Sequence, residues 1–343
     1  MSKENLGLST TVVGSFPLDF TNDNMVKVFK DQIDLGIDFP CYPQLIDMVD
    51  QFLQPLSESL EELDRIGNNY ILKEDFDLPD KPIALKYGKF VKNYLNEDTN
   101  FRKEIKGTKA CLTGPITLST EILLGEKISD GIIPRLFKEP RALMKKEILL
   151  KIANLMRKVG KAYDDMGFNI ISMDEPILSL LIGRKPLFHE ENFYLQIINT
   201  ALKDISTIKS IHVCGTISPS LRDLLLNSDT NIIDHEFQTN EENFSIYKKE
   251  HLEDNNKILA MGTVKTKIKS GDSRNPIDYV ETINEIKGFI NKGIKLYDRE
   301  NLIIKPDCGF RALKGSFSSN FAYEITVRKL ENMVKAKNQI LEG

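Results

Sequence analysis

Residues that ligate soft metal ions recur at the predicted ends of β-strands. His212 and Cys214 are two residues apart, and side chains with this spacing on a strand project to the same side. Glu236 closes the next predicted strand, and Cys308 follows the last one. Two thiolates, one imidazole and one carboxylate form a borderline-soft ligand set that suits Zn²⁺ best. The sequence therefore predicts a zinc site that is assembled from separate strands.

The other cysteines and histidines fit simpler roles. The His-x-Cys pair taken alone equally fits a buried thiol beside a core histidine, so the zinc hypothesis depends on Glu236 and Cys308 as well. Cys41 and Cys111 lie in apolar runs and are expected to be small core residues. His235 neighbours Glu236, so on a regular strand it faces away from the metal.

A thiolate-rich zinc ion has a characteristic substrate. Binding to zinc favours the deprotonated form of a thiol, which is then a nucleophile at neutral pH. The site therefore predicts alkyl transfer to sulfur. Four protein ligands would close a structural zinc site, so catalysis requires that Glu236 yields its place or that the shell expands to five ligands.

Eight short β-branched runs, most of them followed by a segment with helical periodicity, would position these residues. This alternation predicts a (β/α)8 barrel, with a doubly wound open sheet as the alternative. In such a barrel, functional residues lie at the C-terminal ends of the strands. The stretch near residues 56–108 is too long for a simple connection and predicts an insertion. Residues 1–343 are expected to form one zinc-binding domain. The predicted strands are Thr10–Val13, Gly36–Phe39, Lys109–Leu112, Asn169–Met173, Ile208–Val213, Asn231–Glu236, Lys257–Met261 and Leu302–Lys305.

Composition excludes several classes of function. The 343 residues include 46 Lys and Arg against 50 Asp and Glu, a net charge of −4, which excludes a strongly basic surface for nucleic acid. No run of about 18 apolar residues occurs, so no membrane span is expected. The first nine residues lack the apolar core of a signal peptide, and four scattered cysteines indicate a reducing compartment. The protein is expected in the cytoplasm.

Seven motifs in one order give the sequence a specific resemblance. They are TTVVGSFP, GID…QLIDMV, LTGPITLS, MDEPIL, IHVCG, IIDHEF and PDCGFR, and they run from Thr10 to Arg311. The chain resembles the catalytic half of cobalamin-independent methionine synthase, and within that family the short archaeal-type enzymes that consist of this barrel alone. The wider fold family also includes uroporphyrinogen decarboxylases and methylcobamide:coenzyme M methyltransferases.

The resemblance implies a (β/α)8 barrel in which His212, Cys214, Glu236 and Cys308 hold zinc. It further implies that the Ser15 segment and Asp174 position the thiol substrate, with the amino group of homocysteine near Asp174. Where the long enzymes place a glutamate for this amine, the chain has Gln44. This departure leaves coenzyme M, or another thiol, as an alternative to homocysteine.

A second departure bears on the methyl donor. Lys267 stands where the long, folate-using enzymes carry a proton-donating histidine. Loss of that acid favours a methylcorrinoid donor, because the corrinoid needs no proton when it gives up the methyl group. The corrinoid-binding signature D-x-H-x-x-G is absent, so we expect a separate corrinoid protein to deliver the methyl group. Lys265, Lys267 and Arg311 are candidates to contact this donor or an anionic group of the substrate.

Two further alternatives remain open from the sequence. One is a decarboxylase of the uroporphyrinogen type, although the first 60 residues contain no arginine for substrate carboxylates. The other is a zinc-stabilised barrel that serves only as a binding subunit.

Overall fold

A six-stranded parallel sheet forms the centre of the computed structural model, which describes residues 6–97 and 104–343. Its strand order is β3-β5-β6-β7-β8-β9. Nearly all of its residues are buried, as in parallel sheets that are covered on both faces. The strands are β3 (Lys109–Thr113), β5 (Ile170–Asp174), β6 (Ile208–Val213), β7 (Ile232–His235), β8 (Ile258–Gly262) and β9 (Leu302–Lys305).

Two N-terminal segments close this sheet into a ring, at the places of the first two predicted strands. Each contributes single parallel bridges, and side chains add contacts to the first segment: Lys109 donates to the carbonyl of Val12, and the Cys111 thiol donates to that of Val13. The predicted (β/α)8 barrel is confirmed. The closing bridges join Thr10 to Ile304, Thr11 to Phe39, and Cys41 to Lys109.

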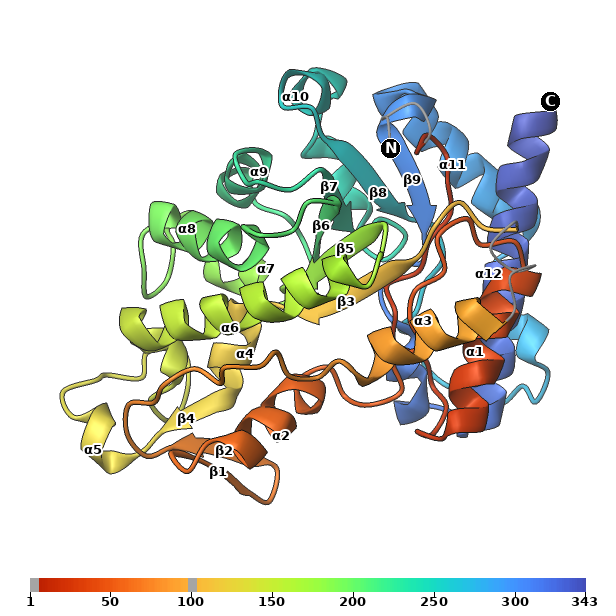
Figure 1. Ribbon diagram of the computed structural model, residues 1–343. Coiled ribbons are helices and arrows are strands. Elements are labelled where there is room, and N and C mark those ends of the chain that lie inside the picture. The colour runs from red at the N-terminus through yellow and green to blue at the C-terminus, as the bar shows by residue number, and fades with distance from the viewer. Residues whose placement is uncertain (1–5, 98–103) are drawn as a thin grey trace.

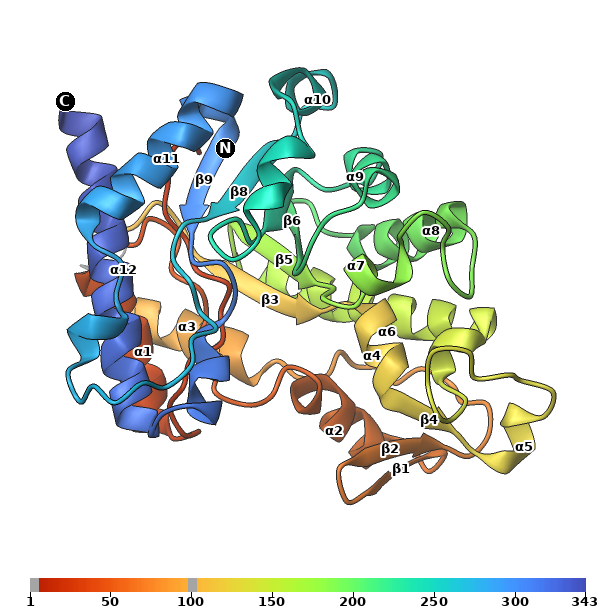
Figure 2. The same cartoon turned by 180° about the vertical axis from the view of Figure 1, so that it is seen from behind.

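Helices surround the ring on its outer side, as Figures 1 and 2 show. Local signals set several of their starts. Ser218 caps α9 by accepting the N–H of Leu221, and Thr282 forms a capping box with Glu285 at the start of α11. The helices are α1 (Asn22–Asp34), α2 (Asp50–Ser59), α3 (Lys86–Glu97), α4 (Pro115–Glu121), α5 (Glu126–Ser129), α6 (Lys146–Asp165), α7 (Leu178–Leu181), α8 (Glu191–Leu202), α9 (Pro219–Leu226), α10 (Lys249–Asp254), α11 (Ile283–Tyr297) and α12 (Ser319–Glu342).

The insertion predicted near residues 56–108 contains a β-hairpin and α3. The hairpin strands β1 (Leu63–Ile66) and β2 (Asn69–Leu72) are antiparallel, and β2 pairs in parallel with β4 (Ile122–Leu124). This small sheet lies with α2 and α5 to one side of the ring (Figure 1). Residues 98–103 of the predicted insertion lie outside the described residues.

Across residues 6–97 and 104–343, none of the helices combines the length and the apolar character that crossing a bilayer would need.

Candidate metal centre

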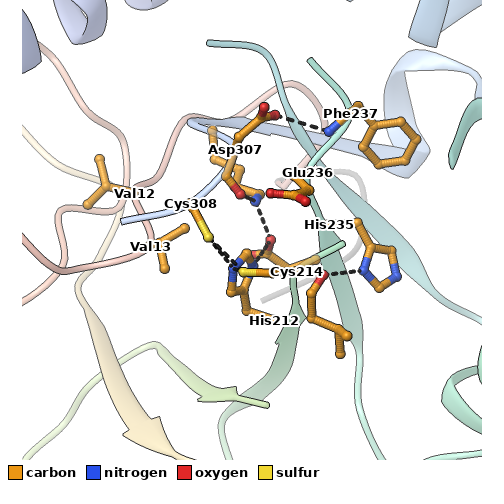
Figure 3. A network of polar contacts seen from close by, with 12 residues as sticks. Val12, Val13, His212, Cys214, His235, Glu236, Phe237, Asp307 and Cys308 are labelled. Carbon is orange, nitrogen blue, oxygen red and sulfur yellow. Dashed lines mark hydrogen bonds and ion pairs between the residues drawn. The ribbon is translucent and has the colours of Figure 1, made fainter. Parts of the chain in front are cut away.

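Strand ends bring three of the four predicted metal ligands together. His212 lies near the end of β6 and Cys214 directly follows that strand, while Cys308 lies in the turn after β9. The Sγ atoms of the two cysteines are 2.7 Å apart, and Nε2 of His212 is 3.1 Å from Cys214 Sγ and 3.4 Å from Cys308 Sγ. Figure 3 shows the three side chains converging on one point. This cluster has the ligand types and the spacing to hold a metal ion.

A carboxylate on the neighbouring strand orients the histidine. Asp234 of β7 lies opposite His212 in the sheet, and Nδ1 of His212 donates to its Oδ1 at 2.6 Å. This bond leaves Nε2 facing the two thiols. Metal-bound histidines commonly donate their second ring nitrogen to a carboxylate in this way. Burial lowers the pKa of His212, but the charge of Asp234, its hydrogen bond and the charge of Cys308 together raise this pKa to about 10.

Two buried lysines surround the same carboxylate. Lys305 Nζ lies 2.5 Å from Asp234 Oδ1, and Lys109 Nζ lies 3.9 Å from Oδ2. Burial opposes the ionisation of Asp234, yet Lys305 and His212 hold its pKa well below the usual range. The pKa of Cys308 is also held well below its ordinary value, by the hydrogen bond from Cys214 and, against burial, by the charges on His212 and Lys305.

The fourth predicted ligand, Glu236, lies beside the cluster without joining its compact geometry (Figure 3). Its Oε1 accepts the backbone N–H of Gly215 at 2.7 Å and the side-chain amide of Asn240. The charge of Glu236 is close enough to contribute to the raised pKa of Cys214, after the hydrogen bond to Cys308 and burial. His235 points away, as predicted, and bonds to the Val213 carbonyl and to Tyr247.

The cluster forms part of the wall of a cavity of about 380 Å³. All eight predicted site residues other than Glu236 and Lys265 line this cavity, and their polar or ionisable groups could face a small substrate. The lining residues include Ser15, Gln44, Asp174, His212, Cys214, Lys267, Cys308 and Arg311.

Asp174, the last residue of β5, is a buried carboxylate with unused hydrogen-bonding capacity. Its Oδ1 has no hydrogen-bond partner within residues 6–97 and 104–343, although the residue is only 6% exposed. Burial raises the pKa of Asp174 to about 7, against the opposing charges of His212 and Lys109. A cationic group of a ligand would satisfy this oxygen. The adjacent Glu175 turns away and accepts the N–H groups of Ile116 and Thr117 at the start of α4.

Ser15 and Gln44 lie side by side through a parallel bridge. The Gln44 amide donates to Gln51 at 2.7 Å, which fixes its position. Ser15 approaches the turn after Cys308 so closely that a Cβ atom on Gly309 would lie 1.9 Å from its hydroxyl oxygen. The glycine in the Asp-Cys-Gly turn is therefore needed for Ser15 to reach the cavity.

The three predicted cationic residues separate into two groups. Lys267 and Arg311 line the cavity, and Arg311 donates to the carbonyl of Leu45 at 2.6 Å. Lys265 is exposed and does not line it, while its backbone N–H donates to Glu281. The structure thus brings two of the three to the cavity.

Sequence reasoning missed the charged residues behind the cluster. Asp307 accepts the backbone N–H groups of Phe237, Gln238 and Thr239, so it ties the turn after Glu236 to the residue before Cys308. The sequence does contain a signal for three other charged residues behind the cluster. Lys109, Asp234 and Lys305 are charged residues inside otherwise apolar strands, where an ion is found only with a partner.

Comparisons with known proteins agree with this architecture. The family described as "Cobalamin-independent synthase, Catalytic domain" matches residues 99–339. The methionine synthase of Methanocaldococcus jannaschii is 28% identical over 96% of this chain and 99% of its own length. A B12-independent methionine synthase from Shewanella, solved with selenomethionine, has a TM-score of 0.68 at 18% identity and covers 98% of both chains.

A second kind of relative is longer. The 5-methyltetrahydropteroyltriglutamate–homocysteine methyltransferase of Bacillus velezensis is 26% identical over 75% of this chain, which spans only 30% of that relative. The matched family comprises methyltransferase enzymes, so the decarboxylase alternative is set aside.

The expectation of a methylcorrinoid donor was wrong. The matched family is cobalamin-independent, and the longer relative is named for a methyltetrahydropteroyl donor. Lys267 in place of the histidine therefore does not indicate a corrinoid donor, and the structure shows only that this side chain lines the cavity. The separate corrinoid protein expected as a partner falls with that donor. The relatives' names also give no support to coenzyme M as the thiol.

Proposed function

The chain belongs to the family of cobalamin-independent synthase catalytic domains, and on that premise we propose that it methylates the thiol of homocysteine to give methionine. The donor proposed is a 5-methyltetrahydropteroyl compound, the class named for the Bacillus relative. One observation carries the proposal: a His-Cys-Cys cluster and an unpartnered buried carboxylate share one cavity. An amino acid that bears a thiol would satisfy both.

The ligand set supports Zn²⁺ as the metal. His212, Cys214 and Cys308 supply one imidazole and two thiols, and borderline-soft zinc prefers such donors. We propose Glu236 as the fourth, exchangeable ligand, because its carboxylate is already held beside the cluster by Gly215 and Asn240. When bound, zinc would hold the substrate thiol as a thiolate at neutral pH.

We propose that Asp174 binds the substrate's ammonium group through its unpartnered oxygen. The α-carboxylate then faces the cationic side of the cavity, where Lys267 and Arg311 lie. Ser15 and Gln44 complete the polar wall and exclude other orientations. In the transfer itself, the sulfur–methyl bond forms as the nitrogen–methyl bond of the donor breaks. The donor nitrogen keeps the electron pair of the broken bond and takes up one proton, which balances the proton that the substrate thiol loses on becoming a thiolate. The contribution of the chain is to hold the sulfur in line with the donor. We propose that the whole chain acts as one zinc-binding domain.

The test compares two thiols that differ in one group. Zinc-loaded protein receives 5-methyltetrahydropteroyltriglutamate with either homocysteine or 4-mercaptobutanoate, which lacks the amino group. We expect methionine from homocysteine and a kcat/KM at least tenfold lower for 4-mercaptobutanoate. The Asp174→Asn variant should lose about 10²-fold with homocysteine, because an ammonium–carboxylate bond is worth about 2–3 kcal/mol, and little with the analogue. Absence of methylation from this donor would refute the proposed function and leave a binding role for the zinc-loaded barrel.

A further inference from the structure

Four ionisable side chains form a buried network directly behind the metal cluster. We call Lys109, Lys305, Asp234 and His212 the buried relay; none of its members is more than 2% exposed. Burying an ion costs several kcal/mol unless it is paired, so each charge in this network needs a partner inside the core.

Lys305, the last residue of β9, links the turn that carries Cys308 to Asp234 of β7, the partner of His212. Its ammonium contacts Asp234 Oδ1 at 2.5 Å, the same oxygen that accepts the Nδ1–H of His212. It also donates to the carbonyl of Asp307 at 2.8 Å, the residue directly before Cys308. The orientation of His212 and the position of Cys308 therefore depend on one ammonium group.

Lys109 approaches the relay from the other side. It lies 3.9 Å from Asp234 Oδ2, an oxygen with no hydrogen-bond partner among the described residues, and donates to the carbonyl of Val12. The attraction between Lys109 and Asp234 is thus one of charge, without a hydrogen bond. Asp174 is the other carboxylate whose charge acts on Lys109.

The relay carries one more positive than negative charge when His212 is neutral, since two lysines face one aspartate. A zinc ion with two protein thiolates and a substrate thiolate carries a net charge of −1. The one surplus positive charge of the relay balances the net charge of −1 on this zinc site, and opposite charges within a low-dielectric interior interact strongly.

We propose that Lys305 and Lys109 are positioning residues of the metal centre: through Asp234 they fix the ring of His212, and they supply the counter-charge for a three-sulfur zinc site. The inference rests on the proposed function, because it concerns the zinc ion assigned there. It adds two residues that touch neither metal nor substrate.

The first measurement is metal affinity, by competition with a chromophoric chelator. Lys305→Met keeps the length of the side chain and removes its charge, and we expect it to weaken Zn²⁺ binding by 10- to 100-fold, as is usual for groups that orient metal ligands. Lys257→Met is the matched control. Lys257 is also buried, but it donates to the backbone carbonyls of Ser228 and Thr230 and so lies outside the relay. Its loss should leave the affinity unchanged.

The second measurement separates a relay from general destabilisation. Asp234→Asn should weaken zinc binding in the wild-type background, and combining it with Lys305→Met should cost less than the sum of the two single losses, because part of the effect of Lys305 passes through Asp234. Additive losses would overturn the inference. The thiolate-to-Co²⁺ charge-transfer band of the cobalt-substituted protein should shift in Lys305→Met and stay unchanged in Lys257→Met.

The outcomes distinguish the two proposals. If wild-type protein binds no zinc, the proposed function fails and the inference with it. If wild-type protein binds zinc and folded Lys305→Met binds it equally well, the inference alone is refuted. Should Lys305→Met fail to fold, as circular dichroism would show, Lys109→Met replaces it, with an expected weakening in the same direction and the same criterion for refutation.

Discussion

The barrel holds two pairs of cysteines. In both pairs the sulfur atoms lie close together, but the pairs differ in solvent exposure and in the groups around them. Cys214 and Cys308 have Sγ atoms 2.7 Å apart, are partly exposed, and have a histidine ring nitrogen within 3.5 Å. Cys41 and Cys111 have Sγ atoms 3.3 Å apart and are fully buried. The Cys111 thiol donates to the Val13 carbonyl at 2.7 Å, and no histidine joins this pair in the metal-ligating clusters of the described residues.

The comparison shows that two adjacent thiols do not make a metal site. Cys214 and Cys308, the site pair, have a third ligand, access to a cavity, and cationic groups that stabilise a thiolate. Cys41 and Cys111, the core pair, lack access to a cavity. Burial and the neighbouring Cys41 thiol raise the pKa of Cys111 well above its ordinary value. A thiol that stays protonated is a poor ligand.

Serine substitutions would separate the two pairs most strongly. Cys308→Ser should abolish tight zinc binding and methyl transfer together, because it removes one of two thiolates from the site. Cys111→Ser should retain one equivalent of zinc. Metal content after dialysis, measured by atomic absorption, tests both variants. Retention of zinc and activity by Cys308→Ser would contradict the ligand assignment.

A pH series would test whether an ionised Asp174 binds the ammonium group of a substrate whose thiol lies at the site pair. The raised pKa of about 7 means that Asp174 is ionised above pH 7 and takes up a proton as the pH falls through 7. The preference for homocysteine over 4-mercaptobutanoate should therefore fall about tenfold from pH 8 to pH 6. Because both substrates have a thiol, protonation at the metal cancels in the ratio of their kcat/KM values. A ratio independent of pH would exclude an ionised Asp174 as the ammonium partner.

The smallest expected difference lies in stability. In metal-free protein, Cys111→Ala should lower the free energy of unfolding by about 1–3 kcal/mol, because it removes a buried hydrogen bond and leaves a small cavity. Cys214→Ala, at a partly exposed position, should cost less. Urea denaturation followed by circular dichroism gives both values. Equal losses would mean that the two pairs contribute alike to the core.

The sequence predicted the fold because strand patterns are local. The runs Ile208–Val213 and Leu302–Lys305 agree with β6 and β9 at both ends. Helix starts depend on local capping contacts. A short 3-10 helix covers Pro276–Tyr279, and α11 begins only at Ile283, where Thr282 forms a capping box with Glu285.

The candidate site could be predicted in part, for a physical reason. His212, Cys214 and Cys308 follow from strand periodicity and from the convergence of strand ends. Whether Lys265 or Lys267 reaches the cavity depends on a long loop after β8, where no periodicity sets the direction of side chains. The pairing of Asp234 with His212 depends on the register between β6 and β7, which one sequence does not specify.

The ring closure described above also sets the order in which the metal centre can form during synthesis. Cys214 and Cys308 are 94 residues apart, and the bridge between Thr10 and Ile304 that closes the barrel forms only after Ile304 has been synthesised. At about 5–20 residues per second, the ribosome releases Cys214 roughly 5–20 seconds before its partner thiol. During that interval the nascent chain carries Cys214 without its partner thiol, so zinc can be held by both thiolates only after residue 308 has been synthesised.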